Sequence, residues 1–166
     1  MIDRHTLMLA AAALVLGGSP ARASDISAKP MQAGAVEPGA RQPAAVVDRF
    51  HAALASANVP AALAQLSDDA IVFESGGVER GKREYAAHHA AADAAFAKAV
   101  PSRTIRRSGH ASGDFAWILT EGRTTGTFKD KAVDRVTAET MLLRRNGGVW
   151  RIVHVHWSSA AAPATK

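Results

Sequence analysis

The sequence predicts an α+β domain in which three N-terminal helices lie on one face of a curved antiparallel sheet. Apolar residues recur at helical spacing up to about residue 99, whereas strand-forming residues dominate after Pro101. The chain ends on two strand-like runs that flank Asn146-Gly147-Gly148, a turn sequence that favours hairpins. Helices that come first and a long meander that follows are typical of an α+β fold with its helices on one side.

The first 23 residues predict a signal peptide. Arg4 and His5 precede an apolar run from Leu7 to Leu16, and Ala21-Arg22-Ala23 supplies the small-x-small pattern that signal peptidase reads. We therefore expect cleavage before Ser24 and a periplasmic or secreted protein. The apolar run has half of the roughly 20 residues that a membrane-spanning helix needs. We expect no membrane association after cleavage.

The composition argues against several classes of protein. The chain has no cysteine, so neither a disulfide nor a lipidated cysteine can hold it. The full chain has 20 basic and 15 acidic residues, and residues 1–23 contain Arg4, Arg22 and Asp3. Without residues 1–23, 18 basic and 14 acidic residues remain, and the net charge is +4. A single tyrosine, few other aromatic residues and no nucleic-acid motif accompany this mild charge. We expect no nucleic-acid partner.

The elements follow one another within a single domain. Residues 24–42 contain two prolines and two glycines without an apolar period, which predicts a flexible linker. The domain is expected over residues 43–159, followed by a disordered tail over 160–166. Pro43 suits the first turn of a helix, and Val46, Val47, Phe50 and Leu54 continue it at helical spacing. A short second helix follows Asn58, and a third is expected over residues 82–99.

The strands are expected as a short hairpin and a longer meander. Residues 70–74 form a strand that Ser75-Gly76-Gly77 turns back through residues 78–80. Four strands follow Pro101, over about residues 103–111, 115–125, 133–145 and 149–158. The third helix lies between these two groups, so the meander supplies most of the sheet.

This order of elements resembles the nuclear transport factor 2-like superfamily, in particular its SnoaL-like and ketosteroid-isomerase-like members. The resemblance covers about residues 44–159 and depends on Asp69-Ala70-Ile71-Val72-Phe73, on Gly81 before the third helix, and on the closing stretch Gly148–Ser158. It implies a cone-shaped sheet wrapped around the helices with a pocket inside, and a homodimer formed through the outer sheet face. Function differs widely within the superfamily, so the resemblance implies a fold more than an activity.

The last strand carries the most concentrated chemistry. Its alternation places Trp150, Ile152, His154 and His156 on one face. A two-residue loop at Gly147-Gly148 sets Glu139 opposite His156, and a loop at Asn146-Gly147 sets it opposite His154; a three-residue loop would reverse the parity. In the first two cases we expect a Glu–His pair in the pocket. Such a pair suits a general base or a structural hydrogen bond.

The third helix is expected to supply further pocket residues. Tyr85, His89 and Phe96 share one face, and His88 lies at its margin, whereas Asp93 lies roughly 80° away from Tyr85 on the helical wheel. The remaining predicted pocket residues are Phe73, Glu74 and Trp117. His154 and His156 are spaced so that they can converge on an ion, but the spacing is common in strands, so we predict no metal and no cofactor. His51 and His110 are expected at the surface or at the core margin.

Three hypotheses remain open on sequence alone. The first is a pocket that binds a small apolar or amphipathic molecule, walled by Trp117, Tyr85, Phe73 and Phe96, with His154, His156, His89 and Glu139 orienting the ligand. The second is a cofactor-free isomerase, dehydratase or hydrolase in which His154 or His156 is the general base and Glu139 or Glu74 its partner. The third is a non-catalytic dimerisation module.

Overall fold

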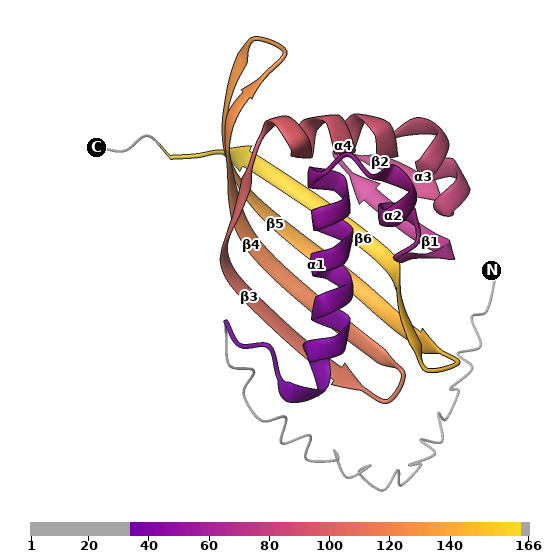
Figure 1. The fold of residues 1–166 in the computed structure, drawn as a ribbon. Helices are drawn as coiled ribbons and strands as arrows, with labels where there is room; N and C mark the ends of the chain where they lie inside the picture. Colours follow the sequence, from indigo (N-terminus) through magenta and orange to yellow (C-terminus); the bar gives the residue numbers. More distant parts are fainter. Residues whose placement is uncertain (1–33, 164–166) are drawn as a thin grey trace, which may run out of the picture. The chain divides into compact units, whose positions relative to one another are not determined.

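The computed structural model describes residues 34–163, which form the helices and strands shown in Figure 1. The predicted signal peptide and most of the predicted linker lie outside these residues. In chain order the elements are η1 (Pro38–Ala40), α1 (Arg41–Ala55), α2 (Val59–Leu63), β1 (Leu66–Glu74), β2 (Gly77–Arg80), α3 (Lys82–His88), α4 (Ala90–Ala99), β3 (Ser102–Ser112), β4 (Phe115–Phe128), β5 (Lys131–Asn146) and β6 (Val149–Ala161).

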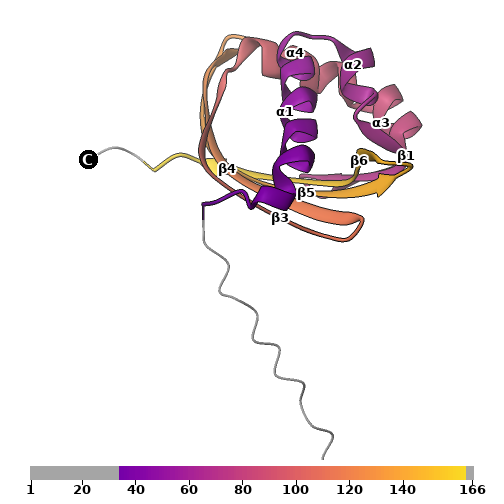
Figure 2. The same cartoon turned by 60° about the horizontal axis from the view of Figure 1, so that its bottom comes forward.

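The six strands form one open, curved sheet in the order β2-β1-β6-β5-β4-β3. The predicted α+β class is confirmed, with the helices gathered on the concave side of the sheet (Figures 1 and 2). All neighbouring strands are antiparallel except β1 and β6, which run parallel. The far ends of β3, β4 and β5 bend up toward α4, so the sheet wraps around α1 (Figure 2).

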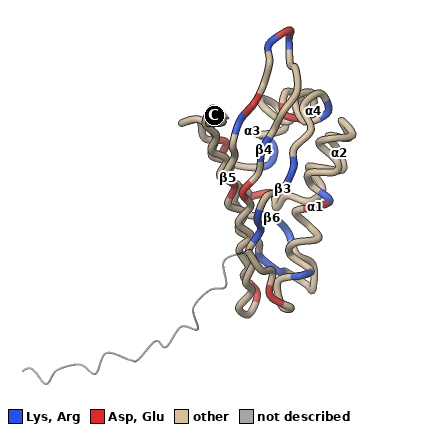
Figure 3. Tube along the Cα trace, turned by 90° about the vertical axis from the view of Figure 1, so that its left-hand side faces the viewer, with Lys and Arg blue, Asp and Glu red and all other residues tan. Residues whose placement is uncertain are grey.

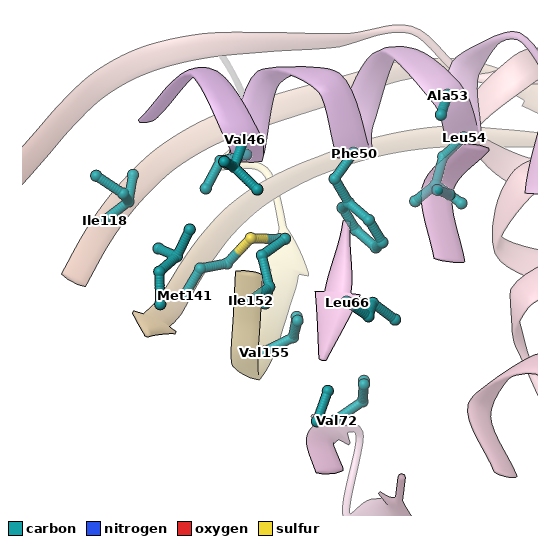
Figure 4. Packing of buried hydrophobic residues seen from close by; sticks show 14 of the residues in the cluster. Val46, Phe50, Ala53, Leu54, Leu66, Val72, Ile118, Met141, Ile152 and Val155 are labelled. Carbon is teal, nitrogen blue, oxygen red and sulfur yellow. The ribbon is translucent and has the colours of Figure 1, made fainter. Parts of the chain in front are cut away.

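The core lies between α1 and the concave face of the sheet. Val46, Phe50 and Leu54 recur at helical spacing and point from α1 toward the strands, where Met141 and Ile152 meet them (Figure 4). Phe50, Met141 and Ile152 are fully buried. Each such side chain contributes about 1.5–3 kcal/mol through the removal of apolar surface from water. This packing fixes α1 over the middle of the sheet.

The two predicted ends of the domain differ from the structure. Within the predicted linker, Val36 pairs with Gly109 of β3, η1 follows, and α1 begins at Arg41 rather than at Pro43. Gly109 makes this possible, because a Cβ atom there would lie 2.7 Å from Cδ1 of Ile118 and 3.3 Å from Cβ of Ala40. At the other end, β6 continues to Ala161 beside β5, so the predicted tail is strand through that residue.

The predicted third helix is two helices. α3 ends at His88 and α4 starts at Ala90, because His89 between them has φ −119° and ψ −35°. The backbone therefore changes direction at His89, and angles counted along a single straight helix do not hold across it. This break determines which side chains of α4 can reach Tyr85 on α3.

The closing hairpin contains a β-bulge that the sequence pattern does not show. Asn146 pairs with Val149 across the predicted two-residue loop, and the pairing stays regular as far as Leu143 with Ile152. The register then shifts by one residue, because Leu142 pairs with His154 and leaves Val153 as the extra residue. A bulge of this kind reverses which residues beyond it face each side of the strand.

Charged residues of both signs are interspersed along the domain. Figure 3 shows basic positions on β3 and β4 next to acidic ones, and both signs occur at the tip of the β4–β5 hairpin. Several arginines form ion pairs with aspartates, such as Arg123 with Asp134 and Arg144 with Asp69. No helix within residues 34–163 is both long enough and apolar enough to cross a membrane.

Candidate functional site

A cavity of about 240 Å³ lies between the β1–β2 hairpin and helix α3. The residues that line it are Val72, Glu74, Ser75, Gly77, Glu79, Tyr85 and His89. Two of its walls come from β1 and β2, which pair Val72 with Glu79 and Glu74 with Gly77. Gly81, with φ +124°, turns the chain from β2 into α3 and brings Tyr85 over these strands. Three of the predicted pocket residues, Tyr85, Glu74 and His89, meet here.

Tyr85 and Asp93 form a partly buried hydrogen bond beside this cavity. The Tyr85 side chain is fully buried, and its hydroxyl donates a 2.8 Å hydrogen bond to Oδ2 of Asp93. The break at His89 brings Asp93 to this position, so the expectation that Asp93 points away from Tyr85 is wrong. Burial, followed by the negative charge of Asp93, raises the pKa of the Tyr85 hydroxyl, which therefore stays protonated.

Two carboxyl groups near Tyr85 are held away from their ordinary titration range. Burial raises the pKa of Asp93, although the Tyr85 hydrogen bond and the charge of His89 oppose the shift. Loss of hydration, and then the charge of Asp93, raise the pKa of Glu74 at the mouth of the cavity. A carboxyl group whose pKa is raised exchanges protons nearer to neutral pH than an exposed carboxyl group does.

His88 and His89 both approach the carboxylate of Glu79. Nδ1 of His88 lies 3.2 Å from Oε2, and Nδ1 of His89 contacts Oε1. Glu79 is buried, whereas about half of each imidazole is exposed. Glu79 therefore orients His89 at the wall of the cavity and places His88 outside it.

Glu139 lies on β5 and does not line the cavity; its partner Trp157 packs near Tyr85, with ring centroids 6.5 Å apart. Oε2 of Glu139 lies 2.7 Å from Nε2 of His51 and accepts a 2.7 Å hydrogen bond from Nε1 of Trp157. Burial alone would raise the pKa of this carboxyl, but His51, Trp157 and the nearby Thr120 hydroxyl outweigh burial and hold the pKa below its usual range. Glu139 is thus a buried, ionised carboxylate.

The predicted pairing of Glu139 with His154 or His156 is wrong. The bulge at Val153 places Glu139 opposite Trp157 and sets His156 opposite Thr140. Val155 and Trp157 face the core, whereas His154 and His156 face outward. The loop has the predicted two residues, so the error comes from the register shift beyond it.

The outer face also holds other residues that were expected in the pocket. The Phe73 ring lies edge-on to His154 and His156, with centroids 5.0 and 6.2 Å away. Nδ1 of His154 lies 3.0 Å from the carbonyl oxygen of Ile71. Trp117 lies beside His110, with ring centroids 5.9 Å apart. These rings do not line the cavity.

Phe96 lies on α4, away from the cavity. Its ring packs edge-on against that of Phe128 at 5.3 Å, where the bent end of β4 approaches the helix. Phe96 therefore joins α4 to the wrapped end of the sheet.

A family model for the SnoaL-like domain matches residues 44–163, which is most of the chain and nearly all of the described structure. The chain belongs to the SnoaL-like domain family. The resemblance inferred from the sequence is thereby confirmed. A search of curated proteins finds no match to the chain.

Solved structures resemble this SnoaL-like domain over most or all of their length. A proposed ketosteroid isomerase from Shewanella frigidimarina is 34% identical, with a TM-score of 0.71, and the match covers 75% of this chain and all of the other. A proposed calcium/calmodulin-dependent protein kinase II association domain from Xanthomonas campestris is 23% identical, with a TM-score of 0.61 and coverage of 80% and 96%. A cystatin-like protein of unknown function from Nostoc punctiforme is 16% identical, with a TM-score of 0.61 and coverage of 72% and 89%. The last two show the fold alone.

One cluster within residues 34–163 has donors arranged for a metal ion. Glu79, Glu84 and His88 each offer a ligand atom, and these atoms lie within 4.8 Å of one another. Two carboxylates and one imidazole suit zinc or another divalent cation. The cluster lies at the outer end of α3 in this SnoaL-like domain, where His88 is exposed.

Four residues of the SnoaL-like domain were not predicted as site residues: Asp93, Glu79, His51 and Trp157. The expected place of His51 at the core margin is confirmed by its half-buried side chain. Asp93 depends on the helix break and Trp157 on the bulge, and neither has a sequence signal. Glu79 follows from pairing across the two-residue turn at Ser75-Gly76, which sets it opposite Val72. His51 follows Phe50 directly on α1, so the helical wheel already placed it at the margin of the buried face.

Proposed function

We propose that the SnoaL-like domain binds a small amphipathic molecule in the cavity between β1, β2 and α3. The main support is the composition of the cavity: Val72 lines an apolar wall, and Tyr85, Glu74 and His89 line a polar end. A few convergent polar groups in a mostly apolar recess are the usual composition of a ligand site. The volume of about 240 Å³ lies below the roughly 300–1,000 Å³ of drug-sized ligand sites. The ligand is therefore small.

The polar end favours a ligand that carries a carbonyl or hydroxyl oxygen. The Tyr85 hydroxyl stays protonated, so it can donate to a ligand oxygen if it turns from Asp93. Glu74 and His89 offer partners for a hydroxyl group. 2-Cyclohexenone is a suitable probe, because it combines a six-membered apolar ring with one carbonyl oxygen.

The binding test compares wild-type protein with Tyr85→Phe. Phenylalanine keeps the ring against Trp157 and removes only the hydroxyl group. We expect 2-cyclohexenone to bind the wild type and to bind Tyr85→Phe roughly fivefold to tenfold more weakly, since one hydrogen bond contributes about 1 kcal/mol. Phe73→Leu, on the outer face, serves as the control and should bind as the wild type does. Equal binding by wild type and Tyr85→Phe would refute this use of the cavity.

A second candidate function is isomerisation of a small unsaturated ketone by proton transfer. It is favoured by the two carboxyl groups with raised pKa next to a tyrosine hydroxyl, and by the 34% identity to a proposed ketosteroid isomerase. Glu74 would take a proton from the carbon next to the carbonyl, Tyr85 would donate to the enolate oxygen, and the proton would return two carbons further along. No cofactor is needed.

The isomerase candidate is tested with 3-cyclohexenone, whose conversion to 2-cyclohexenone is followed by ultraviolet absorbance. Glu74→Gln should abolish the protein-dependent rate, whereas His154→Ala and His156→Ala should keep it. If Glu74→Gln leaves the rate unchanged, or if the wild type adds nothing to the buffer rate, the cavity is a binding site only.

We further propose a homodimer that uses the outer sheet face. Ile71, Phe73 and Leu142 are each about 40% exposed and lie on neighbouring strands with His154 between them. Contiguous exposed apolar side chains of this kind mark interaction surfaces. Native mass spectrometry should give a dimer for the wild type and a monomer for Leu142→Asp. Ile105→Asp, at an exposed residue of β3 outside this face, should remain dimeric.

We also propose export, on the pattern of residues 1–23. Expression of the full chain in a Gram-negative host should yield protein in the periplasmic fraction whose first residue is Ser24. Full-length protein confined to the cytoplasm would contradict this proposal.

A further inference from the structure

The buried carboxylate of Glu139 is not among the residues that line the cavity. Its side chain is only 7% exposed, its Oε2 lies 2.7 Å from Nε2 of His51, and the same oxygen accepts the hydrogen bond from Nε1 of Trp157. Oε1 is fully buried and has no hydrogen-bond partner within residues 34–163. Buried carboxylate oxygens without a donor are uncommon, since each costs free energy when it is removed from water. His51, Trp157 and the nearby Thr120 hydroxyl are the groups that keep this buried carboxylate ionised.

His51 connects this carboxylate to the solvent. Its side chain is 40% exposed, and its Nε2 lies 2.7 Å from Oε2 of Glu139. The Phe50 ring lies edge-on at 5.6 Å, which limits how the imidazole can turn. Among the described residues nothing bonds to Nδ1. When Nε2 holds the proton that Glu139 accepts, Nδ1 presents its lone pair to solvent, as a general base requires.

We propose that His51 and Glu139 form a second acid–base centre, separate from the cavity, that hydrolyses small esters. His51 is the catalytic residue and Glu139 the positioning residue. The geometry is that of a buried acid behind a partly exposed histidine, an arrangement that holds one tautomer and stabilises the imidazolium ion. Trp157 fixes the carboxylate through Nε1, and its ring is in turn held by Phe50, at 6.1 Å.

The other charged groups nearby neutralise one another. Arg107 on β3 forms an ion pair with Asp48 on α1, and its Nε donates a 3.1 Å hydrogen bond to the Thr120 hydroxyl. Thr120 pairs with Glu139 across β4 and β5. Glu139 is thus the charge that acts most directly on His51.

A second Glu–His pair in the same chain provides a matched comparison. Nδ1 of His110 lies 2.8 Å from Oε2 of Glu37, and the His110 side chain is 43% exposed, close to the value for His51. The two pairs differ in the carboxylate, because the Glu37 side chain is 50% exposed. Water screens an exposed charge and weakens its effect on the imidazole. We therefore assign the activity to His51 and not to His110. His88 and His89 also contact a buried carboxylate, but they share the single carboxylate of Glu79, whereas Glu139 serves His51 alone.

The reaction is balanced without a cofactor. Nδ1 of His51 takes a proton from a water molecule while the water oxygen attacks the ester carbonyl carbon. The tetrahedral intermediate then collapses, the bond to the alcohol oxygen breaks, and the imidazolium returns its proton to the leaving alkoxide. The products are the acid and the alcohol. Glu139 stays ionised throughout, and nothing is oxidised or reduced.

The test uses p-nitrophenyl acetate and measures the second-order rate constant of the wild type against free imidazole at the same pH. His51→Gln is the main variant, because its amide N–H can still donate to Glu139 while the base is lost. Positioned general bases contribute roughly 10²–10⁴-fold. We expect His51→Gln to lose most of the protein-dependent rate and His110→Gln to keep it within about twofold. Added imidazole should rescue His51→Ala with saturation and leave His110→Ala unaffected.

The positioning role of Glu139 is tested by the tautomer of His51, which a loss of stability alone would not change. The ¹⁵N shifts of the His51 ring should show Nε2 protonated and Nδ1 unprotonated in the neutral wild type, and a mixture of tautomers in Glu139→Leu. Glu139→Gln should lower the rate about tenfold with an unchanged circular dichroism spectrum. The proposal is overturned if His51→Gln and His110→Gln lose equal activity, or if the wild type is no faster than free imidazole. Saturating 2-cyclohexenone should leave ester hydrolysis by the wild type unchanged, which separates this centre from the cavity.

Discussion

Replacing Val155 or its neighbour His156 with alanine tests which face of β6 points into the core. Val155 is fully buried and pairs with Met141 and Val72, whereas His156 is exposed on the outer face beside Phe73. Val155→Ala removes two methyl groups' worth of buried surface, at about 0.8 kcal/mol for each buried carbon, and leaves a small void. We expect a loss of about 2 kcal/mol from the free energy of unfolding.

His156→Ala should change the free energy of unfolding by no more than about 0.5 kcal/mol, as exposed substitutions usually do. Urea unfolding followed by circular dichroism measures both variants. The free energy of unfolding falls by roughly 2 kcal/mol per molar urea, so Val155→Ala should lower the urea concentration at the unfolding midpoint by about 1 M. In a regular β6 strand without the bulge, His156 would face the core. A larger loss for His156→Ala than for Val155→Ala would therefore refute the bulge at Val153.

Three further predictions concern local features. Asp93→Asn keeps an acceptor for Tyr85 and removes a carboxyl whose pKa is raised in the folded state. That carboxyl stabilises the fold most below its unfolded pKa, and this stabilisation is lost as pH rises through the folded pKa. In thermal melts from pH 4 to 8 the wild type should therefore lose more stability with rising pH than the variant, and parallel curves would contradict this. Asn58→Ala removes the side-chain bond to the Ala61 amide at the start of α2 and should cost about 1 kcal/mol in urea unfolding, with no loss if the cap is unimportant. Gly109→Ala should cost about 1–3 kcal/mol in the same assay, because the new methyl group meets both Ile118 and Ala40. A neutral result would mean that the segment before α1 is not packed closely there.

The fold could be predicted because two periodicities dominate the chain. Val46, Phe50 and Leu54 specify the buried face of α1, and the residues after Pro101 alternate as strands do. Turn chemistry added the closing hairpin, whose two-residue loop at Gly147-Gly148 is confirmed. Each periodicity depends on neighbouring residues and repeats over many of them, so a single irregularity does not obscure it.

The candidate site was harder to predict because single residues decide it. Ile152, Val153 and Val155 all favour strands and all suit either face, so the pattern does not reveal that Val153 is extra. The alanine-rich stretch around His89 favours a continuous helix, so the break that joins Tyr85 to Asp93 has no local cause in the sequence.

The central proposal is that a small molecule binds between the β1–β2 hairpin and α3 and not on the outer face. Titration of ¹⁵N-labelled protein with 2-cyclohexenone, followed through backbone amide shifts, tests it directly. We predict saturable shifts at Gly77, Glu79 and Tyr85, with little change at Leu142 and His156 on the outer face. Saturable shifts confined to Leu142 and His156, or no saturable shift at any of these amides, would contradict the proposal.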